Sequence, residues 1–193
     1  ILINKTFGCV RFVYNYYLNK RIEAYKENKQ NINYYDCSAD LTMLEQQLLW
    51  LKEVGRSALQ NALRDLDKAY QNFFREIKKD NKKQGFPRFK SKHNHKQSYR
   101  TTSNKNNNIE VKNDKIKLPK LGWVKIAQSQ DIQGRILNCT IIRTCSNKYY
   151  VTVCCTDVEI EKYEQTKNVV GLDLGIKEFA ITSDGEIIKN PKY

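Results

Sequence analysis

The sequence predicts an α+β protein in which a helical bundle is followed by a small antiparallel β-barrel. Apolar and aromatic residues recur at helical spacing within residues 1–80, whereas from residue 109 onward they alternate with polar residues. Spacing of three to four residues gathers side chains on one face of a helix, and alternation gathers them on one face of a strand. The 193 residues, 40% hydrophobic and 11% aromatic, suffice for one or two folded domains.

Two amphipathic helices are expected first. Helically spaced aromatic and apolar residues predict a helix over residues 6–28, with Thr6 as a possible N-terminal cap. Leucines at similar spacing predict a second, shorter helix from about residue 39 to 52, with Ser38 or Asp40 as its cap. Polar residues separate the two.

The third helix is the clearest element of the sequence. Its apolar stripe runs from Leu59 to Ile77, and the opposite face is basic. At its start, Ser57 and Gln60 have capping-box spacing, so both could satisfy backbone N–H groups. Arg56, Gln60 and the neighbouring Asn61 could also enter a DNA groove, where Gln reads adenine and Arg reads guanine. Three such helices can pack into a bundle with a basic outer surface.

A strongly basic segment follows the helices. Residues 78–105 hold ten Lys or Arg and one acid, Asp80, which is nine of the net thirteen positive charges of the chain. Such a run is either a solvated linker or a nucleic-acid-contacting segment, which we place at residues 81–108. Interleaved aromatic residues favour nucleic acid, because rings stack on bases while cations follow the phosphates.

The strands are expected between residues 109 and 160. About five antiparallel strands are separated by turn sequences, among them Asn113-Asp114 and Ser146-Asn147-Lys148. That number is enough for a small barrel, with Trp123 in its core.

Metal ligation before residue 160 and membrane insertion are both disfavoured. The six cysteines form no C-x-x-C pair, and His93 and His95 have no nearby Cys or carboxylate, so reduced structural thiols are favoured over a zinc site. The apolar stretches are too short for a membrane span, and no signal peptide is recognisable. We therefore expect a cytoplasmic protein without a membrane partner.

The last segment, residues 161–193, contains the strongest catalytic candidate. Asp173 stands in the middle of an apolar run that reads as a buried strand, where a carboxylate needs a partner. A basic side chain could fill that role, but a divalent metal is the more natural partner beside flanking glycines. Asp184-Gly185 then signals a tight hairpin. A nuclease core of the ribonuclease H type begins in this way.

One aspartate does not complete such a site. Hydrolysis by two Mg²⁺ ions requires several converging carboxylates. Asp184 is better explained as a turn residue, and Glu178 and Glu186 as exposed strand charges. The missing ligands are therefore expected beyond Tyr193, and this piece alone is expected to bind no Mg²⁺ and to be inactive in cleavage.

Five motifs together resemble the transposon-encoded TnpB (OrfB) family, whose members are related to type V CRISPR effectors. They are Phe7-Gly-Cys-Val-Arg-Phe-Val-Tyr-Asn15, Leu51-Lys-Glu-Val54, Ala58-Leu-Gln-Asn-Ala-Leu-Arg-Asp-Leu66, Phe86-Pro-Arg-Phe-Lys-Ser-Lys92 and Gly171-Leu-Asp-Leu-Gly-Ile-Lys177. The resemblance covers nearly the whole chain. It implies an RNA-guided DNA endonuclease of a prokaryotic cytoplasm, associated with the nucleoid, whose partners are a guide RNA from the transposon end and a double-stranded DNA target.

The resemblance also assigns parts and residues. It implies a recognition bundle (1–80), a wedge-like barrel (109–160) and the first hairpin of an incomplete RuvC-like domain (161–193) that uses Mg²⁺ in the full-length protein, with Asp173 as its first carboxylate. Candidates for reading the target-adjacent motif are Arg56, Ser57 and Gln60, then Tyr34 and Thr102. The expected nucleic-acid contacts are Arg56, Ser57, Gln60, Arg64, Lys82, Lys83, Phe86, Arg88, Phe89, Lys90, Lys92, Tyr99, Arg100 and Thr102.

This chain departs from the family pattern at both ends. The usual opening wedge strand, the later RuvC Glu and Asp, and the four-cysteine zinc ribbon are not in it, so we expect the N-terminal and central portion of a longer protein. Two other interpretations stay open. One is a transposase accessory protein or repressor that binds DNA by a helix-turn-helix without RNA; the other is a sugar kinase or actin-like fold, whose first phosphate loop also has an Asp-x-Gly strand.

Overall fold

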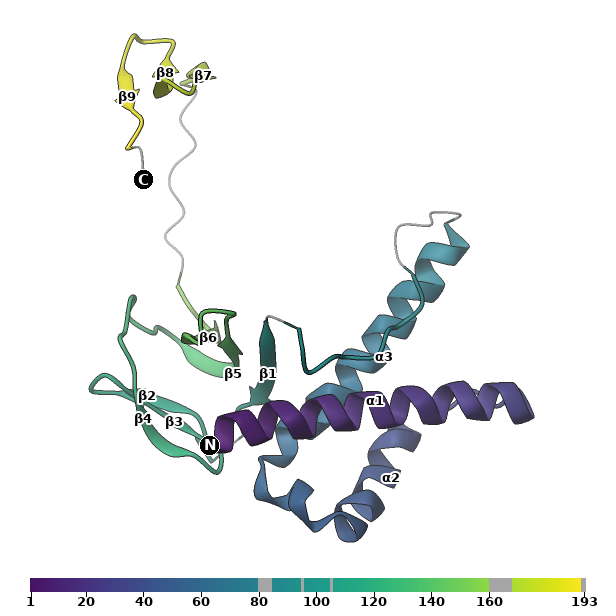
Figure 1. The fold of residues 1–193 in the computed structure, drawn as a ribbon. Helices are drawn as coiled ribbons and strands as arrows, with labels where there is room; N and C mark the ends of the chain where they lie inside the picture. Colours follow the sequence, from purple (N-terminus) through teal and green to yellow (C-terminus); the bar gives the residue numbers. More distant parts are fainter. Residues whose placement is uncertain (80–84, 95, 105, 160–167, 192–193) are drawn as a thin grey trace. The chain divides into compact units, whose positions relative to one another are not determined.

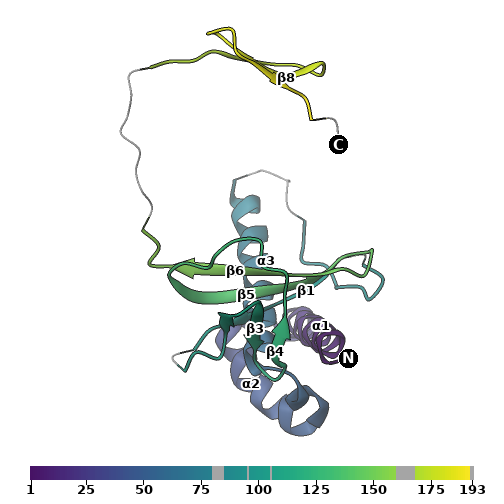
Figure 2. The same ribbon diagram turned by 90° about the vertical axis from the view of Figure 1, so that its left-hand side faces the viewer.

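The computed structural model describes residues 1–79, 85–94, 96–104, 106–159 and 168–191. It confirms an α+β fold with antiparallel sheets, arranged in two compact units, residues 1–158 and 159–193. In the first unit the helices lie on one side and the strands on the other (Figures 1 and 2). The helices of that unit are α1 (Leu2–Asn28), α2 (Tyr34–Gln47), a short 3₁₀ helix η1 (Leu49–Glu53) and α3 (Arg56–Lys78).

The strands form three separate three-stranded sheets. The first has the order β1-β5-β6, the second β2-β3-β4, and the third, in the second unit, β7-β8-β9. Their bounds are β1 (Gln97–Thr102), β2 (Glu110–Lys112), β3 (Lys115–Leu118), β4 (Gly122–Lys125), β5 (Arg135–Arg143), β6 (Tyr149–Thr156), β7 (Leu172–Leu174), β8 (Glu178–Thr182) and β9 (Ile187–Lys189).

The expected closed barrel is not formed by the described strands. β5 is the central strand of its sheet, with β1 on one edge and β6 on the other, so neither edge of β5 is free to pair with the β2-β3-β4 sheet. Sequence reasoning missed β1 because that strand lies inside the basic segment. Strand pairing joins residues about 40 positions apart in the chain, Gln97 and Arg143 among them, which no local pattern reveals.

Both predicted turns between these strands are confirmed. Asn113 and Asp114 have positive φ values of 49° and 53°, as the commonest two-residue hairpin turn requires, and β2 pairs with β3 across them. Asn147, with φ 58°, lies in the turn that joins β5 to β6. Trp123, in contrast, is 47% exposed and is not a core residue. Val124 packs against the core, and neighbouring strand residues face opposite sides.

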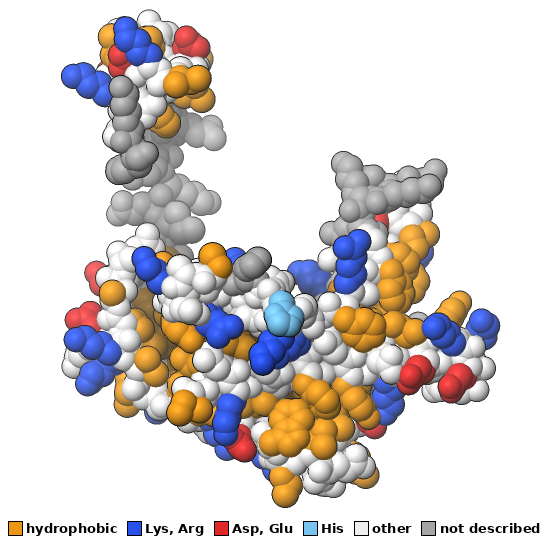
Figure 3. Space-filling view, in the orientation of Figure 1, with side chains coloured by type: hydrophobic (Ala, Val, Ile, Leu, Met, Phe, Trp, Pro, Cys, Tyr) orange, Lys and Arg blue, Asp and Glu red, His pale blue; other side chains and the backbone are white. Residues whose placement is uncertain are grey.

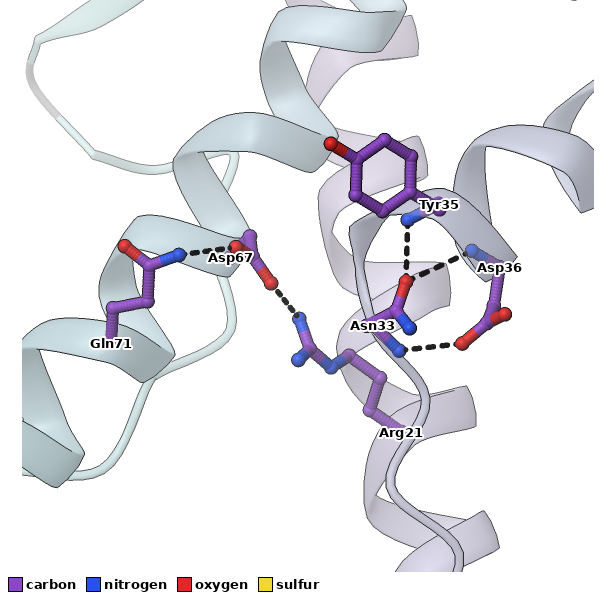
Figure 4. A network of polar contacts seen from close by, with 6 residues as sticks. All are labelled: Arg21, Asn33, Tyr35, Asp36, Asp67 and Gln71. Atoms are coloured by element: carbon purple, nitrogen blue, oxygen red, sulfur yellow. Dashed lines mark hydrogen bonds and ion pairs between the residues drawn. The ribbon is translucent and has the colours of Figure 1, made fainter.

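All predicted helix caps were wrong. Thr6 lies within α1, which begins at Leu2, and its hydroxyl donates to the Leu2 carbonyl oxygen. α2 begins at Tyr34 rather than near residue 39, because Asn33 and Asp36 form a capping box there (Figure 4). The Asn33 side chain accepts from the Asp36 N–H (3.2 Å), and the Asp36 carboxylate accepts from the Asn33 N–H (2.9 Å).

The polar residues expected as caps have other partners. Asp40 accepts from the Tyr17 hydroxyl at 3.0 Å and pairs with Lys20 at 2.8 Å, which ties α2 to α1. At the start of α3 the cap position is Gly55, without a side-chain hydrogen bond, so Ser57 and Gln60 form no capping box.

Arg21 joins α1 to α3 inside the bundle. Its guanidinium is 8% exposed, stacks 4.1 Å from the centre of the Tyr70 ring and donates to the Asp67 carboxylate at 3.3 Å. Gln71 donates to the other oxygen of that carboxylate at 2.7 Å (Figure 4). The buried charge therefore has both an ion pair and a ring to compensate for lost hydration.

Three side chains of α3 make polar contacts with β1, and we call this row of contacts the α3–β1 seam. The Ser57 and Thr101 hydroxyls lie 2.6 Å apart. One turn later Asn61 donates to the Arg100 carbonyl oxygen (3.1 Å) and to the Thr102 hydroxyl (3.0 Å). A further turn on, Asp65 accepts from the Arg100 guanidinium at 2.7 Å. Ser57, Asn61 and Asp65 are four residues apart and therefore share one face of α3. Their contacts fix the orientation of β1 relative to this helix.

Residues 85–94 lie against the helices, and we call them the basic strap. Asn15 on α1 donates to the Lys90 carbonyl oxygen at 2.9 Å and accepts from the Lys90 N–H at 2.8 Å. Gln97, a buried residue, donates to the Asn94 carbonyl oxygen at 2.9 Å and accepts from Arg11 at 3.0 Å. Side chains of α1, which is distant in the sequence, thus hold the described part of this segment in place. A freely moving linker would not make such contacts.

In the second unit the predicted hairpin is present. Gly185 has a positive φ of 83°, and its N–H donates to the Thr182 carbonyl oxygen at 3.0 Å. The Thr182 N–H donates to the Glu186 carbonyl oxygen at 3.0 Å and closes the loop. The loop therefore has three residues, 183–185, rather than the two expected. Among the helices that the structure describes, none is long and apolar enough to cross a bilayer.

Truncation of the bundle core should destabilise the protein. Leu63→Ala removes a side chain that is 1% exposed on α3, and we expect a loss of about 2–5 kcal/mol in the free energy of unfolding. Urea denaturation followed by circular dichroism measures it. Leu49→Ala, at a position 66% exposed, is the matched control, and an equal loss there would contradict the assigned core.

Release of the basic strap should follow from Asn15→Ala. The substitution removes two hydrogen bonds to the Lys90 backbone, each contributing about 1 kcal/mol, so tryptic cleavage within residues 85–94 should become roughly 30-fold faster. Asn19→Ala is the control, because the Asn19 side chain bonds Glu23 of its own helix. Unchanged cleavage in Asn15→Ala would show that Asn15 does not hold the strap.

Candidate nucleic-acid interface

A cleft of about 1000 Å³ lies where α3, β1 and β5 meet, and Glu110 and Val111 of β2 also line it. Its lining mixes polar side chains with apolar ones such as Ile109 and Ile136. Asn61 and Arg64 line it from α3, Arg100 and Thr102 from β1, and Arg135 and Asn138 from β5. Three guanidinium groups beside amide and hydroxyl groups suit phosphate oxygens and base edges equally. The cleft therefore unites three residues predicted as nucleic-acid contacts, Arg64, Arg100 and Thr102.

The seam determines where two of these side chains stand. Asn61 holds the Thr102 hydroxyl and the backbone at Arg100, and Asp65 holds the Arg100 guanidinium. Asp65 and Arg100 are both partly exposed, so their ion pair contributes little to stability and mainly orients the arginine. Arg100 keeps further donors for a second acceptor, because a guanidinium has five.

Arg64 is exposed at the cleft and lies beside Tyr34. Its Nε donates to the Tyr34 hydroxyl at 3.3 Å, and its guanidinium carbon lies 5.6 Å from the ring centre. The structure thus brings together two residues that the sequence places 30 positions apart, both of them candidates for nucleic-acid contact. The aromatic ring limits the freedom of the guanidinium, which lowers the entropic cost of binding.

The start of α3 is less open than the sequence suggested. Arg56 is exposed, but it donates to the Thr42 hydroxyl at 2.7 Å and lies 3.6 Å from the buried Glu45 carboxylate. Ser57 faces Thr101 in the seam, and Gln60 is half-buried. Of these three motif-reading candidates, Arg56 is the most accessible, with part of its charge already balanced by Glu45.

Two cleft residues were missed by sequence reasoning. Arg135 and Asn138 belong to β5, more than 30 residues after β1, and neither stands in a local motif. Arg135 pairs with Asp157 at 3.1 Å, both groups being exposed. Only the pairing of β5 with β1 brings them to the cleft. Asn61 carried a signal, since it stands beside Gln60 at a predicted helix start.

The basic strap presents most of the remaining predicted contacts. Phe86, Arg88, Phe89 and Lys92 are exposed on it. Lys90 places its ammonium 4.2 Å from the centre of the Tyr14 ring. Desolvation of this ammonium group lowers the pKa of Lys90, and the negative charge of Asp65 partly offsets that lowering. The Lys90 residue as a whole is exposed.

Two groups of predicted contacts have a different outcome. Tyr99 is buried, with its ring edge-on to Phe7 at 5.5 Å, so this ring is not presented to nucleic acid in the structure. Its alternation with cations is that of a strand with one face in the core. Lys82 and Lys83 lie outside the described residues.

Asp173 lies at the centre of β7, opposite Ile181 of β8, and it is exposed. Within the described part of the chain, no three His, Cys, Asp or Glu side chains come close enough to hold a metal ion. The described residues therefore do not fit a two-metal centre. Asp173 is sterically open to a cation, but one carboxylate supplies too few oxygen ligands.

The cysteines have the properties of structural thiols. Cys9, Cys37 and Cys139 are buried, and all six are free. Burial raises the pKa of the Cys37 thiol to about 11 and that of Cys139 to about 12. Neutral buried thiols such as these neither attack substrates nor bind metals readily.

Comparison with known proteins identifies relatives of this chain. Residues 1–30 match the helix-turn-helix domain of IS605 OrfB proteins, and in the structure they form α1 and its C-terminal cap, a single helix. The proposed RNA-guided DNA endonuclease InsQ of Escherichia coli (strain K12) is 30% identical over 184 residues, 94% of this chain and 43% of the relative. A second proposed RNA-guided DNA endonuclease, from Streptomyces pristinaespiralis, is 31% identical over 201 residues, 99% of this chain and 46% of that protein.

The chain thus spans less than half the length of these relatives. The matched region includes the bundle, the basic strap and the sheets described above, because the identity extends over nearly the whole chain. On this basis, together with the helix-turn-helix match, the resemblance to the TnpB (OrfB) family is confirmed.

Proposed function

We propose that this chain is the nucleic-acid-binding portion of a TnpB-like, RNA-guided DNA endonuclease. The observation that carries the proposal is the cleft between α3, β1 and β5, where Arg64, Arg100 and Thr102 converge. The names of the two relatives support it, since both are described as RNA-guided DNA endonucleases. The net charge of +13 supports a polyanionic partner.

The cleft suits recognition of a short duplex motif beside the target. Arginine bonds two acceptors of guanine, asparagine bonds adenine, and a threonine hydroxyl bonds several bases. In an RNA-guided enzyme the protein needs to read only this motif, while base pairing with the guide reads the remaining target. A site with few base-reading side chains is therefore sufficient. The basic strap and the outer face of α3 would hold the guide RNA backbone.

Cleavage belongs in this proposal to a longer protein. Mg²⁺ would polarise the scissile phosphate and activate water there, with Asp173 as one of several ligands. Because this chain offers no cluster of carboxylates in its described part, we assign no catalytic step to it.

Purification of the protein from cells that carry its transposon end tests the RNA partner directly. Sequencing of the bound RNA should recover one defined transcript from the transposon end, with strongly salt-dependent affinity. Equal affinity for any polyanion, heparin included, would refute guide binding. Sequence-specific binding to duplex DNA without RNA would instead support a repressor or transposase accessory protein.

Cleft substitutions should change motif recognition. Selection from a randomised duplex library by the RNA-bound protein yields the preferred motif. Thr102→Val or Arg64→Ala should weaken binding to this motif by about five- to 100-fold, because the loss of one base contact costs about 1–3 kcal/mol. Lys148→Ala, an exposed cation in the turn after β5, is the control. If both cleft variants keep the wild-type motif and affinity, the cleft is not the reading site.

The affinity for nucleic acid should not depend on Asp173. Asp173→Asn is expected to leave guide RNA affinity within about twofold, because the residue lies in the other compact unit from the cleft. Fluorescence anisotropy measures the affinity, and a Mg²⁺-dependent nicking assay on supercoiled DNA tests this chain for activity. Nicking that disappears in Asp173→Asn would show that the chain holds a complete catalytic centre.

A further inference from the structure

Aromatic and apolar side chains are exposed on α3 and the basic strap among the residues that the structure describes. The last buried residue of α3 is Tyr70, and beyond it Phe74 is 49% exposed. On the strap, Phe86 is 44% and Phe89 is 54% exposed. Figure 3 shows apolar side chains along α3 with Lys and Arg beside them. We call Phe74, Ile77, Phe86 and Phe89 the aromatic face.

The rings of this face are held in place from beneath. Phe86 lies edge-on to Tyr70 at 5.5 Å and to Phe73 at 5.3 Å, while Phe74 is stacked on Tyr70 at 6.2 Å. Tyr70 itself is fixed by the Arg21 guanidinium on its ring. Edge-to-face pairs of this kind favour one ring orientation. The rings of Phe74 and Phe86 are therefore preorganised rather than free to collapse onto the bundle.

Positive charges flank the face, and the nearby carboxylates are engaged. Lys78 follows Phe74 by one helical turn, and Lys79, Arg88 and Lys92 are also exposed around it. Among the described acids of α3, Asp65 pairs with Arg100, Asp67 with Arg21, and Glu76 with Arg75. The remaining charge is positive, which selects a polyanion over an apolar protein partner.

We propose that the aromatic face binds an unpaired stretch of RNA, with bases stacked on Phe74 and Phe89 and phosphates held by Lys78 and Arg88. In a duplex each base is already stacked between neighbours, so exposed rings would gain nothing from it; unpaired bases are free to stack on them. This inference rests on the proposed function, because that function supplies RNA as the partner. It adds that part of the RNA is bound in single-stranded form.

A comparison of normal and base-free strands isolates the stacking. The probe is a labelled single-stranded RNA of about 12 nucleotides, within the site size of single-strand binders, and a strand of equal length with abasic sites keeps its phosphates. Phe74→Ala/Phe89→Ala should weaken binding to the normal strand at least about tenfold, since each stacked base contributes about 1–3 kcal/mol, and leave abasic binding within about twofold. Fluorescence anisotropy measures both affinities.

Two controls separate stacking from charge and from folding. Tyr35→Ala/Trp123→Ala removes two exposed rings elsewhere and should change neither affinity. Lys78→Gln/Arg88→Gln should weaken both strands and reduce the salt dependence by about 0.7 per removed contact. Because Phe74 and Phe89 are each about half exposed, the melting temperature of their double variant should stay close to wild type.

The inference is overturned if the ring variant binds the normal strand like wild type, or loses the same affinity for both strands. If the transposon-end RNA co-purifies with wild type and the ring variant binds that RNA with equal affinity, the stacking inference fails and the proposed function stands. If no defined RNA co-purifies with wild type, the proposed function fails instead.

Discussion

The α3–β1 seam is the contact on which the arrangement of the first unit depends. It joins the helical part to the sheets through three side chains of α3, Ser57, Asn61 and Asp65, that meet consecutive residues of β1. A polar seam has a directional requirement that an apolar one lacks, because each hydrogen bond needs its partner within a narrow distance and angle. Shifting β1 by one residue would break all three contacts and would also turn the buried Tyr99 and Thr101 to the wrong face.

The same seam explains why the candidate cleft has a defined shape. Arg100 and Thr102 reach the cleft from β1. All residues of β1 pair with β5, which brings Asn138 opposite Thr102 in the sheet and adds Arg135 and Asn138 to the cleft. Recognition of a base edge requires donors and acceptors fixed to within a fraction of an ångström, which side chains on a flexible loop do not provide. The seam and the strand pairing supply that rigidity.

Charge is distributed differently in the interior and on the surface. Inside the bundle Arg21 is neutralised by Asp67 and covered by Tyr70, so it contributes to packing and not to the external field. On the strap and the outer face of α3, Lys78, Arg88 and Lys92 are exposed. The surface is thus able to attract a polyanion from solution. In the function proposed above, the geometry of the cleft and of the aromatic face would determine which part of the polyanion is bound.

The sequence by itself determined the element types, the turns and the charge, because these depend on residues close together in the chain. Helical periodicity identified three helices, the turn pairs Asn113-Asp114 and Asp184-Gly185 identified two hairpins, and five motifs identified the family. The apolar stripe of α3 was also correct as far as Tyr70, beyond which no described element covers Phe74 fully.

Only the tertiary structure decided which polar and aromatic residues are available for binding. Ser57 has the spacing of a cap but faces Thr101, 44 residues later, and Tyr99 stands among cations but packs on Phe7. Local spacing cannot distinguish these outcomes, because the partner that removes a side chain from solvent comes from a distant segment. For the same reason the cleft itself was not predictable, because its lining includes residues of α3, β1 and β5, which become neighbours only when β5 pairs with β1 and β1 docks on α3.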